Sequence, residues 1–241
     1  MSEILEKYKG KKIIVALPGD SFSGDFLINL ILLNNFLNSC GINISYANMR
    51  GSCIHKLRNE CGGADVLNGL FQTPYSTCGA DYDYILWIDS DIRFTNQNFV
   101  DLIEMDKDVC SGWYLQRDRR PACGFLMKKE DKYKKKPPFL LYDKNHIYTF
   151  LNDTEIEKRP EPYIIDWTGM GWMLIKKGVM EKIKYPWFDA KNVRVAKLED
   201  GADLYDSLSE DLSFELSLKE AGFDIWMNPK IRLGHEKVMV I

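Results

Sequence analysis

The sequence predicts an α/β fold with a mixed, mostly parallel central sheet flanked by helices. A short apolar run at 11–17 ends at Pro18-Gly19, as a buried strand does. A helical stretch at 24–39 stops at Cys40-Gly41, and residues 42–47 alternate like a second strand. Strand, helix and strand in this order indicate parallel pairing with the helix packed on one face of the sheet.

The rest of the chain continues the alternation. We expect a short helix at 54–60 and the best-marked strand at 84–88. A helix of about ten residues should begin at Asn96, and a further strand is expected at 108–115. In the second half we expect a strand at 173–175, a helix from Lys177, an amphipathic helix at 210–221 stopped by Gly222, and a last strand at 224–227. The charged stretch 127–138 predicts a solvated loop or hairpin tip. Residues 189–207 lack a clean period and predict a mobile surface loop.

Length and charge restrict the functional class. The 241 residues carry 32 basic and 35 acidic side chains, which gives a net charge of -3 and no global field to recruit nucleic acid or an anionic membrane. The longest apolar stretch, 26–37, is interrupted by three asparagines and predicts no membrane span. The charged N-terminal stretch does not resemble a signal peptide, so a cytoplasmic protein is expected.

Six cysteines, none in a CxxC pair, indicate free thiols rather than a disulfide framework or a structural zinc site. No linker interrupts the sequence. We therefore expect a single domain over 1–241, with a first half at about 11–120 and a second half at about 121–241.

The sharpest functional signal is Asp89-Ser90-Asp91, directly after the apolar strand 84–88. Ligands of open α/β sheets bind at the carboxyl ends of strands, so both acids are expected in a crevice. Two neighbouring carboxylates repel unless a cation or a sugar hydroxyl lies between them, and hard divalent cations bridge such oxygens to phosphates. The alternative is a pair of loop acids that caps the helix beginning near Asn96.

Four segments in order resemble the GT-A glycosyltransferases, which use nucleotide-sugar donors and carry a DXD motif. They are IIVALPGD at 13–20, ILWIDSDIRF at 85–94, DWTGMGWMLI at 166–175 and SEDLSFELSLKEAGFDIWMNPKIRLGHEK at 209–237. The similarity covers most of the chain and is greatest to small viral and bacterial members and to mannan-polymerase-type mannosyltransferases. It implies a metal-dependent hexosyltransferase that moves a sugar from a UDP- or GDP-sugar to a glycan or other hydroxyl acceptor.

On the donor side the resemblance implies a set of metal ligands and a set of donor-binding residues. In it Asp89 matches the acid beside the ribose and the metal, Asp91 a metal ligand, and His235 a late ligand that completes the metal shell. Neutral imidazole suits manganese-type ions better than magnesium, so Mn²⁺ is preferred and Mg²⁺ is possible. The remaining donor-binding candidates are Pro18, Gly19, Asp20, Arg58 and Ser90. For His235 and Arg58 the alternatives are a structural histidine just past a strand and an arginine on the surface of a helix.

The acceptor side is expected at 166–175 and at the start of the last long helix. Its candidates are Trp167, Thr168, Gly169, Gly171 and Trp172. Glycines allow close backbone approach and the tryptophans offer flat faces to a sugar, but core packing explains each tryptophan equally well. Glu210 and Asp211 are the catalytic candidates. The resemblance implies that Asp211 is the general base if the enzyme inverts, and that it positions the acceptor or stabilises positive charge on the sugar ring if the enzyme retains. The alternative is that Asp211 only stabilises the first turn of the helix, with Ser209 as its cap.

Other readings of the Asp-x-Asp motif are possible on the residues alone. A haloacid-dehalogenase-type phosphatase places the motif on an early strand, whereas here it follows a later one. A sugar-nucleotide pyrophosphorylase or other nucleotidyltransferase carries a Gly-rich, basic loop that is not seen near Pro18. A catalytically silent glycan- or nucleotide-binding module on the same fold would not need Asp89, Asp91, Asp211 and His235 together.

Overall fold

The computed structural model describes residues 5–76, 78–126, 148–197 and 202–236. Its centre is a seven-stranded sheet in the order β2-β1-β3-β10-β5-β13-β8. Five strands run in one direction, while β10 and β8 run antiparallel to their neighbours. The expected α/β fold with a mixed, mostly parallel sheet is confirmed. The strands are β1 (Lys12–Pro18), β2 (Asn43–Met49), β3 (Tyr84–Ile88), β5 (Val109–Trp113), β8 (Tyr163–Ile165), β10 (Trp172–Lys176) and β13 (Ile225–Arg232).

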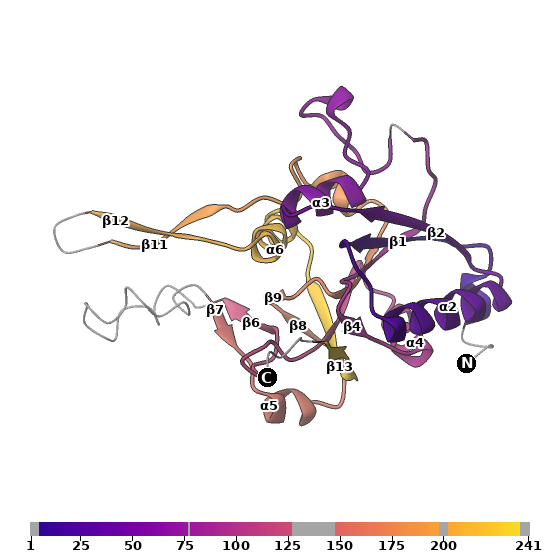
Figure 1. Ribbon diagram of the computed structural model, residues 1–241. Coiled ribbons are helices and arrows are strands. Elements are labelled where there is room, and N and C mark those ends of the chain that lie inside the picture. The colour runs from indigo at the N-terminus through magenta and orange to yellow at the C-terminus, as the bar shows by residue number, and fades with distance from the viewer. Residues whose placement is uncertain (1–4, 77, 127–147, 198–201, 237–241) are drawn as a thin grey trace.

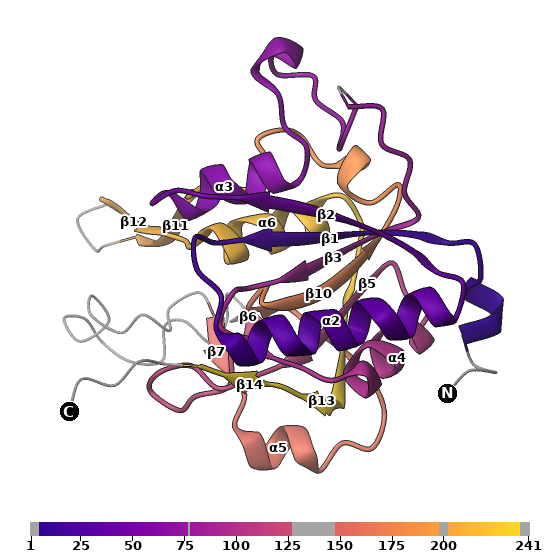
Figure 2. The same ribbon diagram turned by 45° about the vertical axis from the view of Figure 1, so that its right-hand side comes forward.

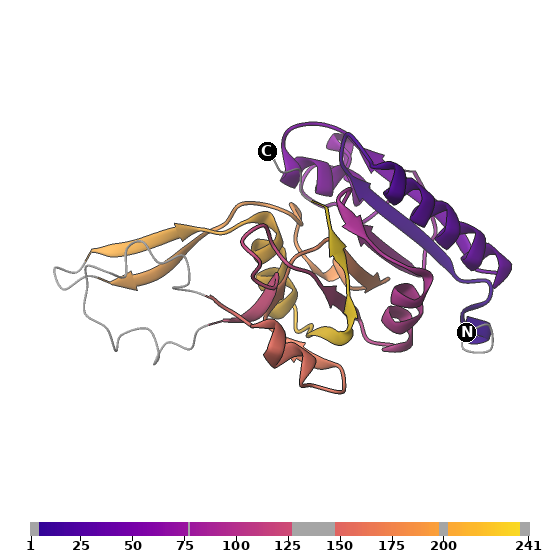
Figure 3. The same ribbon diagram turned by 60° about the horizontal axis from the view of Figure 1, so that its bottom comes forward.

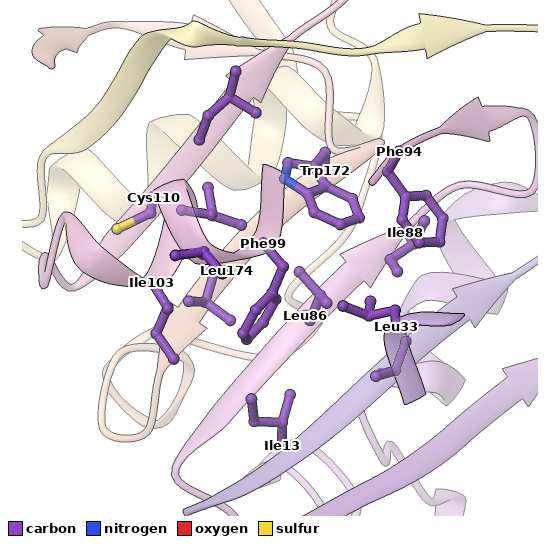
Figure 4. Packing of buried hydrophobic residues seen from close by; sticks show 14 of the residues in the cluster. Ile13, Leu33, Leu86, Ile88, Phe94, Phe99, Ile103, Cys110, Trp172 and Leu174 are labelled. Atoms are coloured by element: carbon purple, nitrogen blue, oxygen red, sulfur yellow. The ribbon is translucent and has the colours of Figure 1, made fainter. Parts of the chain in front are cut away.

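Helices cover both faces of this sheet (Figure 1). One face packs against α2 (Gly24–Ser39) and α4 (Asn96–Glu104), and the other against α3 (Ile54–Cys61) and α6 (Glu210–Glu220). The division follows the period of two in the strands: Ile13 and Val15 of β1 join the first core, and Ile14 and Ala16 join the second. Figure 4 shows Leu33, Leu86, Phe99 and Leu174 interdigitating in the first core.

Local signals explain where the long helices begin. Ser23 caps α2 by accepting the Phe26 amide, Thr95 closes a capping box at α4, and Ser209 caps α6 by accepting the Leu212 amide. Each side chain satisfies a backbone donor that the helix itself leaves unpaired. The predicted helices at 24–39, 54–60, from Asn96 and at 210–221 are thereby confirmed within two residues at each end.

Small elements surround the central sheet. They are β4 (Ile92–Arg93) paired with β14 (Gly234–His235), a sheet of β7 (Tyr148–Phe150), β6 (Cys123–Leu126) and β9 (Trp167–Thr168), helix α5 (Asp153–Glu157), and the 3₁₀ turns η1 (Glu6–Tyr8), η2 (Val66–Asn68) and η4 (Met180–Lys182). None of the helices in the described part of the chain has both the length and the hydrophobicity that crossing a membrane requires.

Two sequence-based expectations are wrong. The helix expected from Lys177 is only the single turn η4, because Gly178 adopts a left-handed φ of 96° just before it and Pro186 follows soon after. The loop expected at 189–207 contains an antiparallel hairpin of β11 (Asn192–Lys197) and β12 (Asp203–Ser207), which extends away from the body of the protein in all three ribbon views (Figures 1–3). An Arg194–Asp203 ion pair of 2.6 Å joins its strands. The charged stretch 127–138 lies outside the described residues.

The six cysteines are free, as expected. Cys61, Cys110 and Cys123 are buried, and burial raises the pKa of the Cys61 thiol to about 11. Cys40 and Cys53 are partly buried, and Cys78 is exposed.

Candidate active site

The carboxyl ends of β1 and β3 border a cleft of about 250 Å³. Five residues singled out in the sequence lie together in its lining: Pro18, Gly19, Asp89, Ser90 and Asp91. Gly51, Ser52, Ile54 and Leu57 complete the lining and carry no motif that would have revealed them. The crevice expected beside the two strand-end acids is therefore present.

The cleft wall after β1 depends on the absence of a side chain at Gly19. Its φ is 153°, and a Cβ there would lie only 3.0 Å from the side chain of Ser90. Asp20 does not line the cleft: one carboxylate oxygen accepts the Gly51 amide at 2.8 Å and so holds the loops after β1 and β2 together. Asn48, which sequence reasoning missed, donates its amide to the carbonyls of Leu17 and Gly19.

Arg58 of α3 lies beside the cleft in the centre of a carboxylate cluster. Its side chain is only 2% exposed, and its guanidinium nitrogens lie 3.0 Å from Asp89, 3.4 Å from Glu210 and 3.3 Å from Asp211. Although burial opposes the charge, Asp89 and Asp211 raise the pKa of Arg58, so it remains a cation. The guanidinium is thus occupied by protein carboxylates. Its burial overturns the alternative of an arginine on the surface of a helix, and its predicted contact with the donor stays a prediction.

Asp211 lies at the start of α6 but does not cap it, because Ser209 does. One oxygen of Asp211 lies near Arg58 and the other accepts the Met170 amide at 3.4 Å. Burial raises the pKa of Asp211 to about 7; Arg58 opposes this shift, and Glu210 and Asp89 add to it. A carboxylate with a pKa near neutrality is suited to proton transfer.

Two carboxylate oxygens of the cluster depend on charge rather than on well-formed hydrogen bonds. Oδ1 of Asp89 and Oδ1 of Asp211 are buried and make no hydrogen bond of good geometry within the described part of the chain, but each lies beside the Arg58 guanidinium. Arg58 therefore compensates the charge of both carboxylates.

The raised pKa of Asp211 predicts a pH-dependent stability difference. The folded protein binds this proton more tightly than the unfolded chain, so the stability that it contributes is full below about pH 3.8 and is lost as the pH rises to about 7. We expect Asp211→Asn to raise the melting temperature relative to the wild type at pH 8 and by less at pH 5. Calorimetry at both pH values measures the difference in melting temperature between the variant and the wild type. An equal difference at pH 5 and pH 8 would contradict the raised pKa.

Removing the single cation of the cluster should destabilise the protein. For Arg58→Met we expect a loss of at least about 2 kcal/mol in the free energy of unfolding, below the ~3–5 kcal/mol of a fully buried pair because the carboxylates retain some contact with water. The matched control is Arg93→Met. Arg93 also contacts two carboxylates, Asp25 and Glu236, but its side chain is 50% exposed, so the cost should be under about 1 kcal/mol. Urea unfolding measures both, and equal losses would contradict the special role of Arg58.

His235 reaches the Asp-x-Asp motif through the small sheet in which β14 pairs with β4. The pairing places His235 opposite Ile92, beside Asp91. Its Nδ1 donates to the Leu115 carbonyl at 2.7 Å, and its Nε2 lies 3.1 Å from Asp91 Oδ2. Because the Leu115 carbonyl can only accept, Nδ1 is the donor of that bond, and the bond orients Nε2 toward Asp91.

These residues fit a divalent ion with two protein ligands. A carboxylate and an imidazole nitrogen held by a backbone carbonyl suit a manganese-type ion whose other positions are taken by phosphate oxygens and water. No group of three or more His, Cys, Asp or Glu side chains that could hold a metal occurs in the residues that the structure describes. The third expected ligand, Asp89, has both oxygens near Arg58, and its metal role stays a prediction.

Most of the expected acceptor side is core. Trp167 and Trp172 are 4% and 0% exposed, and Trp172 stacks on Phe94 with 4.8 Å between ring centroids (Figure 4). Thr168 is buried and its hydroxyl donates to the Ala122 carbonyl. Packing thus replaces the expected contact of these three side chains with a sugar. Gly169 is partly exposed, and the predicted acceptor contact there stays a prediction.

Tyr114 explains both glycines of this segment. A Cβ on Gly169 would fall on the Tyr114 hydroxyl, and one on Gly171 would lie 2.9 Å from it. The Gly171 amide donates to that hydroxyl at 3.2 Å, and the Tyr114 ring packs edge-on against His235 at 4.8 Å. The buried tyrosine therefore supports the turn at 168–171 and the candidate metal ligand together, a role that its sequence position beside Trp113 does not reveal.

Glu215 is a second residue that sequence reasoning missed. It lies one turn after Asp211 on α6 and is 1% exposed. One oxygen accepts the Thr168 amide at 2.7 Å, and burial raises the pKa of this carboxyl well above its usual range. Asp211 and Glu215 together hold the backbone of 168–170 against α6, and their spacing of four residues is the only sequence signal of this role.

Comparisons with known proteins give similarities of structure alone. A197 from STIV matches with a TM-score of 0.48 and 15% identity over 96% of this chain and 96% of that chain. GalNAc-T7, in a structure with UDP, GalNAc and Mn²⁺, matches with a TM-score of 0.44 and 10% identity over 93% of this chain and 43% of that chain. No family model and no curated protein matches the sequence. The chain is thus similar in the path of its backbone to A197 and to part of GalNAc-T7.

Proposed function

We propose that this protein is a metal-dependent glycosyltransferase that moves a sugar from a UDP- or GDP-sugar to a glycan or other hydroxyl acceptor. The observation that carries the proposal is the convergence of Asp91 with His235 at a strand-end cleft, beside the Arg58-centred cluster that contains Asp211. These groups come from four distant parts of the sequence.

The cleft offers a place for the nucleotide part of the donor. Pro18, Gly19 and Ile54 supply apolar or backbone surface, and the Asp89 carboxylate in the cleft wall would accept a ribose hydroxyl. Asp91 and His235 would hold the divalent ion, whose chemistry is to neutralise charge on the departing diphosphate. Arg58 contacts three carboxylates and would orient Asp89, Glu210 and Asp211.

Asp211 is the proposed general base. Its carboxylate accepts the proton of the acceptor hydroxyl while that oxygen forms the new bond to the anomeric carbon, and the bond from this carbon to the diphosphate breaks. The nucleoside diphosphate leaves with the electron pair. In a retaining enzyme Asp211 would instead position the acceptor. Glu210, 3.4 Å from Arg58, has the supporting role of fixing the guanidinium between the carboxylates.

A donor screen by thermal shift tests the proposal. UDP- and GDP-sugars are added with Mn²⁺, with Mg²⁺ and with a chelator, because a ligand that binds only the native state raises the melting temperature. We expect one donor class to stabilise the protein when Mn²⁺ is present. Release of nucleoside diphosphate from that donor is then measured. Stabilisation without release, even with acceptors supplied, would favour a silent binding module, and release of inorganic phosphate from a phosphate ester would favour a phosphatase.

The β11–β12 hairpin is proposed to act as a lid that closes over the donor. It directly precedes α6, and Leu208 and Leu212 pack with Trp167 next to Asp211. We expect amide exchange in β11 and β12 to slow when the donor nucleotide and Mn²⁺ are added, because a closed lid excludes water. Helix α4 serves as the internal control. Equal exchange in the hairpin with and without ligand would contradict the lid.

A further inference from the structure

The outer face of α2 is apolar and open to solvent. Leu27, Ile28, Ile31 and Leu32 are 47–57% exposed, whereas Phe26, Leu33 and Leu37 on the opposite side of the helix are buried against the sheet. Helix α2 contacts β2, because the Tyr46 hydroxyl donates to the side chain of Asn34. A helix on the surface of a protein normally has polar residues on its outer face, so this apolar face indicates a contact.

Strand β2 adds an open backbone edge beside this helix. It is the terminal strand of the central sheet and pairs with β1 over seven consecutive residues without a bulge. The Asn43 amide donates to the Lys11 carbonyl, and the Met49 carbonyl accepts the Gly19 amide. Every second residue from Asn43 to Met49 therefore directs its backbone N–H and C=O groups toward β1. The backbone N–H and C=O groups of the residues in between point outward, away from β1; these residues are Ile44, Tyr46 and Asn48. The Tyr46 hydroxyl donates to Asn34 of α2 at 3.0 Å, which joins the open edge to the apolar helix.

This surface also lacks the features that normally protect an edge. Native proteins block open edges with charged residues, proline or a bulge. The 24 residues from Phe26 to Met49 contain no Lys, Arg, Asp, Glu or Pro. An uncharged surface can face a copy of itself without repulsion between like charges, whereas a charged one cannot.

We propose that this surface is a homodimer interface in which β2 pairs antiparallel with β2 of a second copy and the two α2 helices pack on the same side. An antiparallel strand pair is self-complementary under a two-fold axis, as such an interface requires. The midpoints of the strand and the helix lie close together. Tyr46 is the central residue of β2, and Ile31 and Leu32 are the central residues of α2. The hydrogen bond from Tyr46 to Asn34 places these two centres near each other. One axis can therefore serve both contacts and join two sheets into one.

Sedimentation of the full chain tests the dimer. We expect the wild type to sediment with the mass of two chains at micromolar concentration. Ile31→Lys should weaken association at least about tenfold, because the axis brings two charges together and buries them. The matched control is Leu70→Lys, since Leu70 is 66% exposed on a different apolar segment and should leave the dimer intact. Both substitutions are at exposed positions and should leave the fold unchanged by circular dichroism.

Two further measurements isolate the two contacts. Tyr46→Pro removes an outward amide while keeping the amides that face β1, so it should also give monomers. An equimolar mixture of Ile31→Lys and Ile31→Glu chains should recover the dimer mass, because opposite charges then meet at the axis. A monomeric wild type at every concentration would overturn the proposal, as would a dimer that survives both Ile31→Lys and Tyr46→Pro, or one that Leu70→Lys disrupts instead.

Discussion

Asp211→Asn should fold, bind the donor with its metal ion, and lose at least about a hundredfold in transfer rate, since general-base assistance is typically worth ~10²–10⁴-fold. The amide keeps the shape of the side chain and can still lie beside Arg58, but it cannot accept the proton of the acceptor. Transfer is measured at saturating donor. The wild-type rate should fall as the pH drops below about 7, where Asp211 becomes protonated, and the variant should lose this dependence.

The control separates catalysis from helix stabilisation. Asp153 is also an acid in the first turn of a helix, in α5, and it is exposed. Asp153→Asn should change stability by about 1 kcal/mol or less and leave transfer unaffected. If folded Asp211→Asn transfers at nearly the wild-type rate, Asp211 is an acid of the first helical turn and no more.

Asp91→Ala should abolish Mn²⁺-dependent donor binding, and His235→Ala should weaken it at least about tenfold, since each variant loses a group that we assign to the ion. Binding is measured by thermal shift and by calorimetry with the nucleoside diphosphate, with Mn²⁺ and with a chelator. His55→Ala is the matched control, because His55 is exposed and is not among the cleft-lining residues.

The metal prediction also has a structural test. A crystal structure with donor and Mn²⁺ should place His235 Nε2 roughly 2 Å from the ion, as nitrogen ligands of such ions require. A separation above ~4 Å, or an unchanged Mn²⁺ response in Asp91→Ala, would contradict the assignment. Tighter donor binding with a chelator than with Mn²⁺ would contradict metal dependence itself.

Local signals explain what the sequence could predict. The apolar runs of β1 and β3 can only be buried strands, and Ser23, Thr95 and Ser209 cap helices by contacts with residues three positions away. Asp89 and Asp91 were predictable as cleft residues because the end of a strand in an α/β sheet has a known location. These inferences need no knowledge of distant partners.

The residues that sequence reasoning missed or misplaced depend on long-range contacts. Arg58 is drawn into the carboxylate cluster by Glu210 and Asp211, which lie more than 150 residues further along the chain. Trp172 enters the core because β10 inserts between β3 and β5, an antiparallel insertion that no local pattern indicates. The hairpin at 192–207 was missed because its charged residues interrupt the alternation of apolar and polar side chains by which strands are predicted.

The packing of Tyr114 against two glycines has a consequence for how this protein can diverge. A side chain at 169 collides with the tyrosine hydroxyl, so this position cannot change until residue 114 becomes smaller; one at 171 would also lie 2.9 Å from Ile92. A smaller residue at 114 would in turn leave His235 without its ring contact. Positions 114 and 169 should therefore vary together or not at all among related sequences. A protein engineer who replaces Gly169 with alanine should find the loss partly compensated by Tyr114→Phe, which removes the atom in conflict.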